Sequence, residues 1–306
     1  MKISQAKFTE MHNFRSYSHT DLACEAPANA RNISGAVFND YRAGDFDISE
    51  LTVSDESSSR SCGVAQGRYI TVYCNELTSP ETLSQDTLSA LVCSLLKKIT
   101  EGLVKNDAKI LVAGLGNRSL TADSIGSRTA DRVIATAHLN RSSKEFASLG
   151  IPSVSVISPG VSSQTGMETA DIIKSAAKCA NADIIIAIDA LAAKGTERLC
   201  TTVQISDSGI SPGSGIGNHR TAITKETMGV PVIAIGIPTV ISCATLVYDS
   251  LEKAGTTEID SSLADVLHRS RSLFVSHGES DTICDCAADI LSSAINMAFT
   301  SGMFQS

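Results

Sequence analysis

Two aspartates stand shortly beyond segments that have the pattern of buried strands. Asp123 closes KILVAGLGNRSLTAD (109–123), and Asp189 ends ADIIIAID (182–189). In an open α/β sheet, the carboxyl ends of neighbouring parallel strands meet at one crevice, where ligands bind. Two carboxylates within about 3 Å of each other would hold one proton between them, so that one acts as a base on water and the other as an acid. Acid–base hydrolysis is therefore the first chemistry that the sequence suggests.

Two loops that follow expected strands carry groups able to bind a substrate. The loop that begins at Gly114 contains Asn117, whose amide could polarise a carbonyl group. The loop SPGVSSQTG (158–166) supplies three further candidate substrate contacts, Gln164, Thr165 and Gly166. Backbone N–H groups of residues 114–117 or 160–166 are candidates for holding an oxyanion. The structural alternatives are a helix-capping role for Asp123 and simple turns at 158–166.

Other chemistries lack the residues that they require. The first loop has G-x-G but Ser119 where a dinucleotide-binding turn has its third glycine, and the glycine-rich stretch 207–220 lacks the GK[ST] ending of a phosphate-binding loop. GISPG (209–213) matches the esterase motif GxSxG, but Pro212 has no N–H to offer an oxyanion. The six histidines show no HExxH spacing, and the nine cysteines are scattered. We therefore expect reduced thiols and no metal or cofactor.

Composition indicates an ordinary globular protein of 306 residues, with 42% hydrophobic and 19% charged residues and a net charge of −8. The absence of a Lys/Arg cluster argues against direct nucleic-acid binding, whereas a basic protein substrate would be attracted. No apolar run is long enough to span a membrane, and the N-terminus lacks the apolar region of a secretory signal. We expect a cytoplasmic protein.

Residues 1–18 are polar and unpatterned, so we expect an N-terminal tail followed by one α/β domain over 19–306. Alternation of apolar patterns predicts strands at 68–74, 109–113, 153–157, 183–188, 201–206 and 232–236. Helices are predicted at 80–104, 123–138, 168–180, 224–229, 239–254 and 281–299. This order predicts a mostly parallel sheet with helices on both faces.

Six stretches, taken in order, resemble the germination protease (spore protease) family. They are HTDLACEA (19–26), GLGNRSLTADSIGSR (114–128), VISPGVSSQTGMET (156–169), IIIAIDALAAKGTERL (184–199), TTVQISDSGISPGSGIGNHR (201–220) and KETMGVPVIAIGIPTVI (225–241). The resemblance implies an endopeptidase that degrades small acid-soluble spore proteins during germination, located in the forespore or spore core. It also implies an atypical aspartic-type mechanism that uses Asp123 and Asp189, a self-processing zymogen and a homotetramer. The implied fold is phosphorylase/hydrolase-like and similar to that of hydrogenase-maturation proteases.

The N-terminal tail contains a candidate processing site. The family's substrates are cut after Glu that follows Thr or a similar residue and precedes a bulky apolar one, and Thr9-Glu10-Met11 has that form. We therefore predict self-cleavage between Glu10 and Met11. The chain departs from the family at His19, where Arg is usual, and at Ile125-Gly126-Ser127, where Pro is common. These departures leave the aspartates unchanged.

Two other functions on the same fold stay open. One is a metal-dependent maturation-type peptidase, for which the candidate ligands beside the aspartates are Glu168, Glu197, His138 and His219. The other is a non-catalytic binding protein that has kept the fold, since a fold alone does not determine function.

Overall fold

The computed structural model describes residues 12–13, 20–75, 77, 82–105, 107–143, 148, 150–213, 220–256, 258–270 and 272–300. The processing site proposed at Glu10 and Met11, and His19 of the first motif, lie outside these residues.

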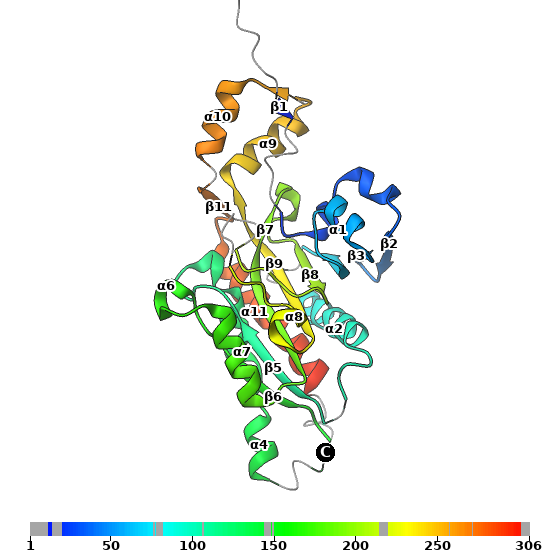
Figure 1. Cartoon of the computed structure of the whole chain (residues 1–306), viewed down its shortest axis with the longest axis vertical. Helices are drawn as coiled ribbons and strands as arrows, with labels where there is room; N and C mark the ends of the chain where they lie inside the picture. Colours follow the sequence, from blue (N-terminus) through cyan, green and yellow to red (C-terminus); the bar gives the residue numbers. More distant parts are fainter. Residues whose placement is uncertain are drawn as a thin grey trace, which may run out of the picture.

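A nine-stranded sheet forms the centre of the described chain (Figure 1). Its main path runs through β2 (Ala36–Ala43), β3 (Phe46–Val53), β4 (Gly67–Tyr73), β8 (Thr202–Ser206), β9 (Val232–Ser242), β7 (Ile184–Ala193), β5 (Lys109–Gly114) and β6 (Ser153–Ile157). The short strand β11 (Phe274–Ser276) pairs with the far end of β9.

The sheet is mixed. Strands β6, β5, β7 and β9 are parallel to one another, whereas β8, β4, β3 and β2 continue it in antiparallel pairs. The predicted α/β class is confirmed, but the strand predicted at 201–206 is antiparallel to its neighbours. The cause is chain length: only residues 194–201 connect β7 to β8, whereas a parallel crossover needs about a dozen residues or more.

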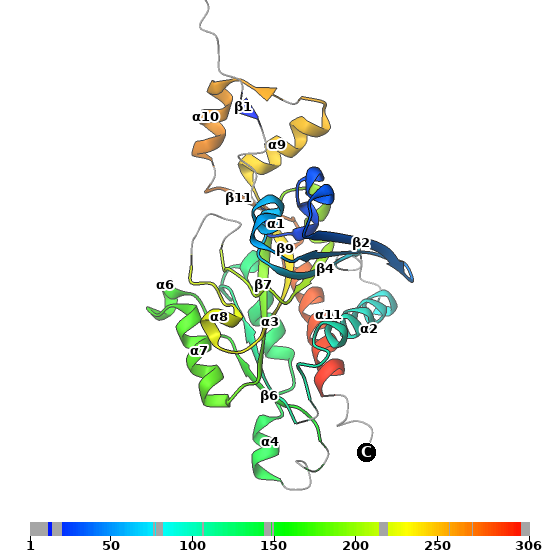
Figure 2. The ribbon, with the colours of Figure 1, turned by 45° about the vertical axis from the view of Figure 1, so that its right-hand side comes forward.

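Helices cover both faces of the parallel part, as Figures 1 and 2 show. Helices α2 (Thr82–Ile99), α3 (Ile125–Arg132) and α11 (Ser280–Phe299) pack on the face that presents Ile110, Val112, Ile184, Ile186 and Ile188. Helix α7 (Thr169–Ala180) packs on the opposite face, which presents Leu111, Ala113, Ile185 and Ala187. Because side chains alternate along a strand, Asp189 lies on the same face of the sheet as Ile185 and Ala187, the face on which α7 packs.

Two strands are longer than their apolar runs indicate. Strand β9 continues to Ser242, so α9 (Cys243–Lys253) begins later than the helix predicted from residue 239. Strand β7 continues to Ala193, so Asp189 lies inside the strand and not at its end. The helix predicted over 123–138 is broken into the short helix η5 (Thr121–Asp123), α3 and α4 (Ala137–Ser142).

The remaining described elements lie around this sheet: η2 (Ala23–Glu25), η3 (Ala28–Asn32), α1 (Glu56–Cys62), α6 (Ser162–Thr165), η6 (Thr196–Arg198), α8 (Lys225–Met228) and α10 (Ser261–Arg269). Helices α9 and α10 form a lobe at the top of Figures 1 and 2. There β1 (His12–Asn13), within the expected tail, pairs with β10 (Glu258–Ile259). Among the described helices, none has the length and apolar character to cross a membrane.

Candidate active site

Strand β7 fixes the position of Asp189. The residue pairs with Gly236 of β9 inside the sheet, and its side chain is 5% exposed. The backbone N–H of Ala190 donates to Asp189 Oδ1 at 2.9 Å. A side chain on Gly236 would lie 2.5 Å from the side chain of Leu191, so glycine at 236 leaves the space that Leu191 fills. Asp189 is therefore a buried acid on a rigid element.

The loop after β5 brings Asp123 to the same place. Gly114, the last residue of β5, is in register with Ile188, and the N–H of Leu115 donates to Ile188 O at 2.8 Å. The loop thus starts beside Asp189. At its other end, the N–H of Asn117 donates to Asp123 Oδ2 at 2.8 Å.

A hydrogen bond and a glycine allow the helix η5, which carries Asp123, to take its position. Thr239 of β9 donates its hydroxyl to the carbonyl oxygen of Ala122. Gly116 has φ +92°, and a Cβ there would lie 2.0 Å from the carbonyl oxygen of Asp123. The loop can close on Asp123 in this way because residue 116 is glycine.

Both aspartates line one cavity of about 230 Å³. Its walls are mainly apolar, and its other charged lining residues are Asp21 and Arg220; the apolar side chains come from Leu115, Leu120, Val161, Leu191, Val240 and Phe274. A water molecule occupies about 30 Å³ in the liquid. The cavity therefore has room for water together with a small group of a substrate.

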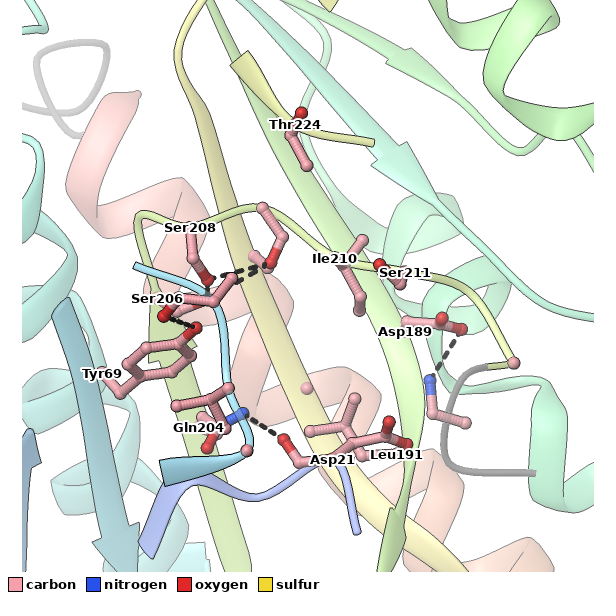
Figure 3. Close-up of a pocket in the computed structure, with 18 residues that line it drawn as sticks. Asp21, Tyr69, Asp189, Leu191, Gln204, Ser206, Ser208, Ile210, Ser211 and Thr224 are labelled. Carbon is pink, nitrogen blue, oxygen red and sulfur yellow. Dashed lines mark hydrogen bonds between the residues drawn. The ribbon is translucent and has the colours of Figure 1, made fainter. Parts of the chain in front are cut away.

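A second, more polar cavity of about 270 Å³ adjoins the first (Figure 3). Asp21, Asp189, Ala190, Leu191 and Gly213 line both cavities. The second cavity adds hydroxyl and amide side chains from Tyr69, Gln204, Ser206, Ser208, Ser211 and Thr224. Asp189 therefore lies where an apolar and a polar cavity meet.

The two carboxyl groups differ in their tendency to ionise. Burial raises the pKa of Asp123, and the N–H of Asn117 partly opposes that shift. Burial raises the pKa of Asp189 well above its usual range, and the charges of Asp123 and Asp21 raise it further. Asp189 is therefore the harder of the two carboxyl groups to ionise. Among the described residues the carboxyl oxygens of Asp123 and Asp189 accept backbone N–H groups and no hydrogen bond joins the two, and the sharing of one proton between them stays a prediction.

The loop 158–166 borders the cavity, although through different residues from those expected. Gly160, Val161 and Ser162 line it, whereas Gln164, Thr165 and Gly166 are exposed and do not. Gln164 Nε2 instead donates to Asn117 Oδ1 at 2.7 Å, which ties this loop to the loop of Asp123. Substrate contact through Asn117, Gln164, Thr165 or Gly166 stays a prediction.

Three backbone N–H groups are available at the cavity. Gly116, Gly160 and Val161 line it, and their N–H groups have no acceptor in the described part of the chain. Such groups can stabilise an oxyanion when they point at it.

Two of the four residues proposed as metal ligands form ion pairs elsewhere. Glu168 pairs with Arg220 at 3.7 Å, and Glu197 with Lys253 at 2.6 Å. His138 lies in α4 and lines neither cavity, and His219 is outside the described residues. Among the residues that the structure describes, no three His, Cys, Asp or Glu side chains form a group able to hold a metal ion.

Sequence reasoning did not assign a role to Asp21, which lines both cavities. It lies within HTDLACEA, a stretch identified only by its resemblance. Nothing in the local pattern indicates that residues 20–25 return to β7.

Comparison with known proteins gives a consistent family. A family model described as germination protease matches residues 15–254. A germination protease of Caldanaerobacter subterraneus subsp. tengcongensis is 39% identical over 239 residues, covering 76% of this chain and 72% of the relative. That of Clostridium tetani is 34% identical over 306 residues, covering 91% and 94%. That of Bacillus subtilis is 39% identical over 242 residues, covering 76% and 66%.

Among solved structures, a NiFe hydrogenase maturation protease from Thermococcus kodakarensis is similar, with 17% identity and a TM-score of 0.35, covering 66% of this chain and 99% of that one. A score this low carries no argument. The extent of the family match and the identity to these relatives show that this chain belongs to the germination protease family.

Proposed function

We propose that this germination protease cleaves peptide bonds by an aspartic-type acid–base mechanism, with Asp123 as the base and Asp189 as the acid. The observation that carries the proposal is the asymmetry of the pair: both carboxyl groups line one cavity, but Asp189 is the more deeply buried and the harder to ionise. A pair of carboxyl groups with separated ionisation can supply a base and an acid at the same pH.

The reaction follows from this protonation state. The Asp123 carboxylate takes a proton from water while the water oxygen attacks the carbonyl carbon of the substrate. The N–H groups of Gly116, Gly160 and Val161 stabilise the negative charge that develops on the carbonyl oxygen. Asp189 gives its proton to the amide nitrogen as the C–N bond breaks, releasing an acid and an amine. Net transfer of a proton from Asp123 to Asp189, through water, restores the pair.

Substitution of each aspartate by asparagine tests this mechanism. We expect Asp123→Asn and Asp189→Asn each to lower kcat by at least about 1,000-fold, with the double variant scarcely worse because the two residues act as a unit. Asp183→Asn is a matched control at the opposite end of β7, since the Asp183 carboxylate accepts the N–H of Lys109 at 2.8 Å and lines neither cavity. Near-normal activity in either catalytic variant would remove that residue from the mechanism.

The substrates are proposed to be small acid-soluble spore proteins, cut in the spore core. Such proteins are disordered when free of DNA, so an extended segment can lie across the two adjoining cavities. The net charge of −8 favours approach of a basic chain. Incubation with a basic spore protein and mapping of the fragments by mass spectrometry tests this assignment, and an uncut substrate would contradict it.

Activation is proposed to occur by self-cleavage between Glu10 and Met11, which releases residues 1–10 of a zymogen. N-terminal sequencing of the activated protein tests the site, and a mature chain that starts anywhere but Met11 contradicts it. Processing that persists in Asp123→Asn would show that another protease makes the cut.

The active protein is proposed to be a homotetramer, as the family resemblance implies. Light scattering on the protein before and after processing measures the mass. A monomeric active enzyme would contradict the proposal.

A further inference from the structure

Helix α11, drawn in red in Figure 2, packs against α2 and α3, and its N-terminal end also contacts η5, which carries Asp123. The hydroxyl of Thr121, the first residue of η5, donates to Asp281 Oδ1 at 3.0 Å. Cys284, which is fully buried one turn further along α11, donates its S–H to the carbonyl oxygen of Thr121 at 3.3 Å. Helix α11 therefore holds Thr121 by its side chain and by its backbone, two positions before Asp123.

Asp281 is itself held by Arg128 of α3. The guanidinium of Arg128 donates to Asp281 Oδ1 at 3.0 Å and to the carbonyl oxygen of Asp281 at 3.3 Å. It also pairs with Asp285, one turn further along α11, at 3.1 Å. Thr121 and Arg128 thus donate to the same carboxylate oxygen, so Asp281 links η5 to α3 as well as to α11.

The three residues of η5 are held by three different parts of the fold. Asp123 accepts the N–H of Asn117 from the loop after β5, and the carbonyl oxygen of Ala122 accepts the hydroxyl of Thr239 from β9. Thr121 is held by α11. A single helical turn is not stable alone, because the cost of fixing its backbone exceeds what its first hydrogen bond returns. The position of Asp123 therefore depends on all three attachments.

The attachment to α11 does not reach the substrate site itself. Thr121, Asp281 and Cys284 line neither cavity, whereas Ala122 and Asp123 line the apolar one. The side chain of Asp281 is 76% exposed, and ion pairs of exposed side chains contribute little to stability. Loss of this carboxylate should therefore change the position of η5 more than the stability of the chain.

We propose that Asp281 is a positioning residue of the peptidase reaction: by holding the hydroxyl of Thr121, it fixes η5 and thereby the place of the Asp123 carboxylate in the cavity. The inference rests on the proposed function, in which Asp123 is the base. Helix α11 lies beyond residues 15–254, the part of the chain that the family model matches. The family match therefore does not include this contact.

Separate measurement of kcat and KM for Asp281→Ala tests the inference. Displacement of a catalytic group by 1 Å costs about 100-fold in rate, and η5 keeps two of its three attachments, so we expect kcat to fall by about tenfold. KM should stay within about twofold of its original value, because Asp281 lines neither cavity. Each protein is assayed as the full chain with its N-terminus sequenced, so that altered processing is not mistaken for altered catalysis.

Asp289→Ala is the matched control. Asp289 also lies on α11 and pairs with Arg132 of α3 at 2.8 Å, and its side chain is 62% exposed. Since it pairs with α3 and not with η5, we expect the kcat and KM of the unsubstituted protein, with the same small change of Tm as in Asp281→Ala. Asp281→Asn is the conservative variant. Its side-chain oxygen can still accept the hydroxyl of Thr121, so kcat should recover to within about threefold of the original value.

A double-mutant cycle tests the route through Thr121. Thr121→Val removes the hydroxyl but keeps the branched shape of the side chain, so we expect the same fall in kcat as in Asp281→Ala. Because both substitutions remove one hydrogen bond, the double variant should be no slower than either single variant. Thr121→Val combined with Asp289→Ala should be no slower than Thr121→Val alone.

The outcomes separate the two proposals. A kcat of Asp281→Ala within about twofold of the original value overturns the positioning role and leaves the aspartate pair intact. An equal fall in Asp289→Ala also overturns it, because the effect would then belong to the packing of α3 on α11. So does a kcat that Asp281→Asn does not recover, or one that falls independently in Asp281→Ala and Thr121→Val, because the effect would then not pass through the hydroxyl of Thr121. Near-normal activity in Asp123→Asn overturns the proposed function and this inference with it.

Discussion

Gly116→Ala should displace Asp123, the proposed catalytic base, while leaving the identity of that residue unchanged. Gly116 has φ +92°, and an added Cβ would lie 2.0 Å from the carbonyl oxygen of Asp123 and 2.9 Å from its Oδ1. Carbon and oxygen atoms that are not bonded approach to about 3.3 Å at the closest. The overlap is therefore more than about 1 Å, and its first partner is backbone, which cannot rotate away.

The expected magnitudes follow from these distances. A left-handed conformation costs an L-residue about 1–2 kcal/mol, and relief of the overlap by a backbone shift costs about 1–3 kcal/mol. The free energy of unfolding should fall by about 2–5 kcal/mol in total. Displacement of a catalytic group by about 1 Å typically costs about 100-fold in rate. We expect kcat/KM to fall by at least that factor in protein that remains folded.

Gly229→Ala provides the matched comparison. Gly229 ends α8 with φ +82°, but nothing lies within 4 Å of its added Cβ. This variant should lose only about 1–2 kcal/mol from the strained backbone and keep its activity. Urea unfolding and peptide-cleavage assays on both variants give the two quantities. Folded Gly116→Ala with activity within about threefold of the unsubstituted protein would refute the reasoning, as would an equal loss of activity in Gly229→Ala.

Three further outcomes are expected. Asp189→Asn should raise Tm by at least about 2 °C at pH 8 but leave it unchanged near pH 4. The reason is that the raised pKa of Asp189 makes its ionisation oppose folding only as the pH rises. Equal shifts of Tm at both pH values would contradict this prediction. Thr239→Val should lower the free energy of unfolding in urea by about 1–2 kcal/mol and should lower kcat, because the carbonyl oxygen of Ala122 loses its hydrogen-bond donor. An unchanged kcat would show that η5 does not need this hydrogen bond. Burial raises the pKa of Asp249, but hydrogen bonds from Lys253 and Thr196 outweigh burial and lower it. Asp249→Asn should therefore lower Tm at pH 7, and by progressively less as the pH falls below 4. A loss of Tm that is independent of pH would exclude the ionic contribution.

Hydrophobic pattern was sufficient to predict the parallel part of the fold. The runs at 109–113, 153–157 and 183–188 and the apolar stripe of 168–180 correspond to β5, β6, β7 and α7 within a few residues. Because β5 and β7 are parallel neighbours, the segments that follow their apolar runs do meet, and both aspartates line one cavity. This part of the prediction needed only local pattern and the rules of strand connection.

The other features depend on tertiary contacts that a local pattern does not encode. The residues after Asp189, Ala-Leu-Ala-Ala, have weak preference for a strand, and they continue β7 because β9 pairs with them on one side. Residues 20–25 meet β7 across about 170 positions of sequence. Gln164 lies in the short helix α6, where its side chain donates to Asn117, whereas Val161 and Ser162 line the cavity.

The extension of β7 past Asp189 gives the two proposed catalytic groups different kinds of support. Asp189 is built into a strand with partners before and after it, so its position changes only if the sheet changes. Asp123 lies on a short helix that is held by individual hydrogen bonds from other elements, among them those of Asn117 and Thr239. Substitutions in this loop should therefore displace Asp123 while Asp189 stays in place.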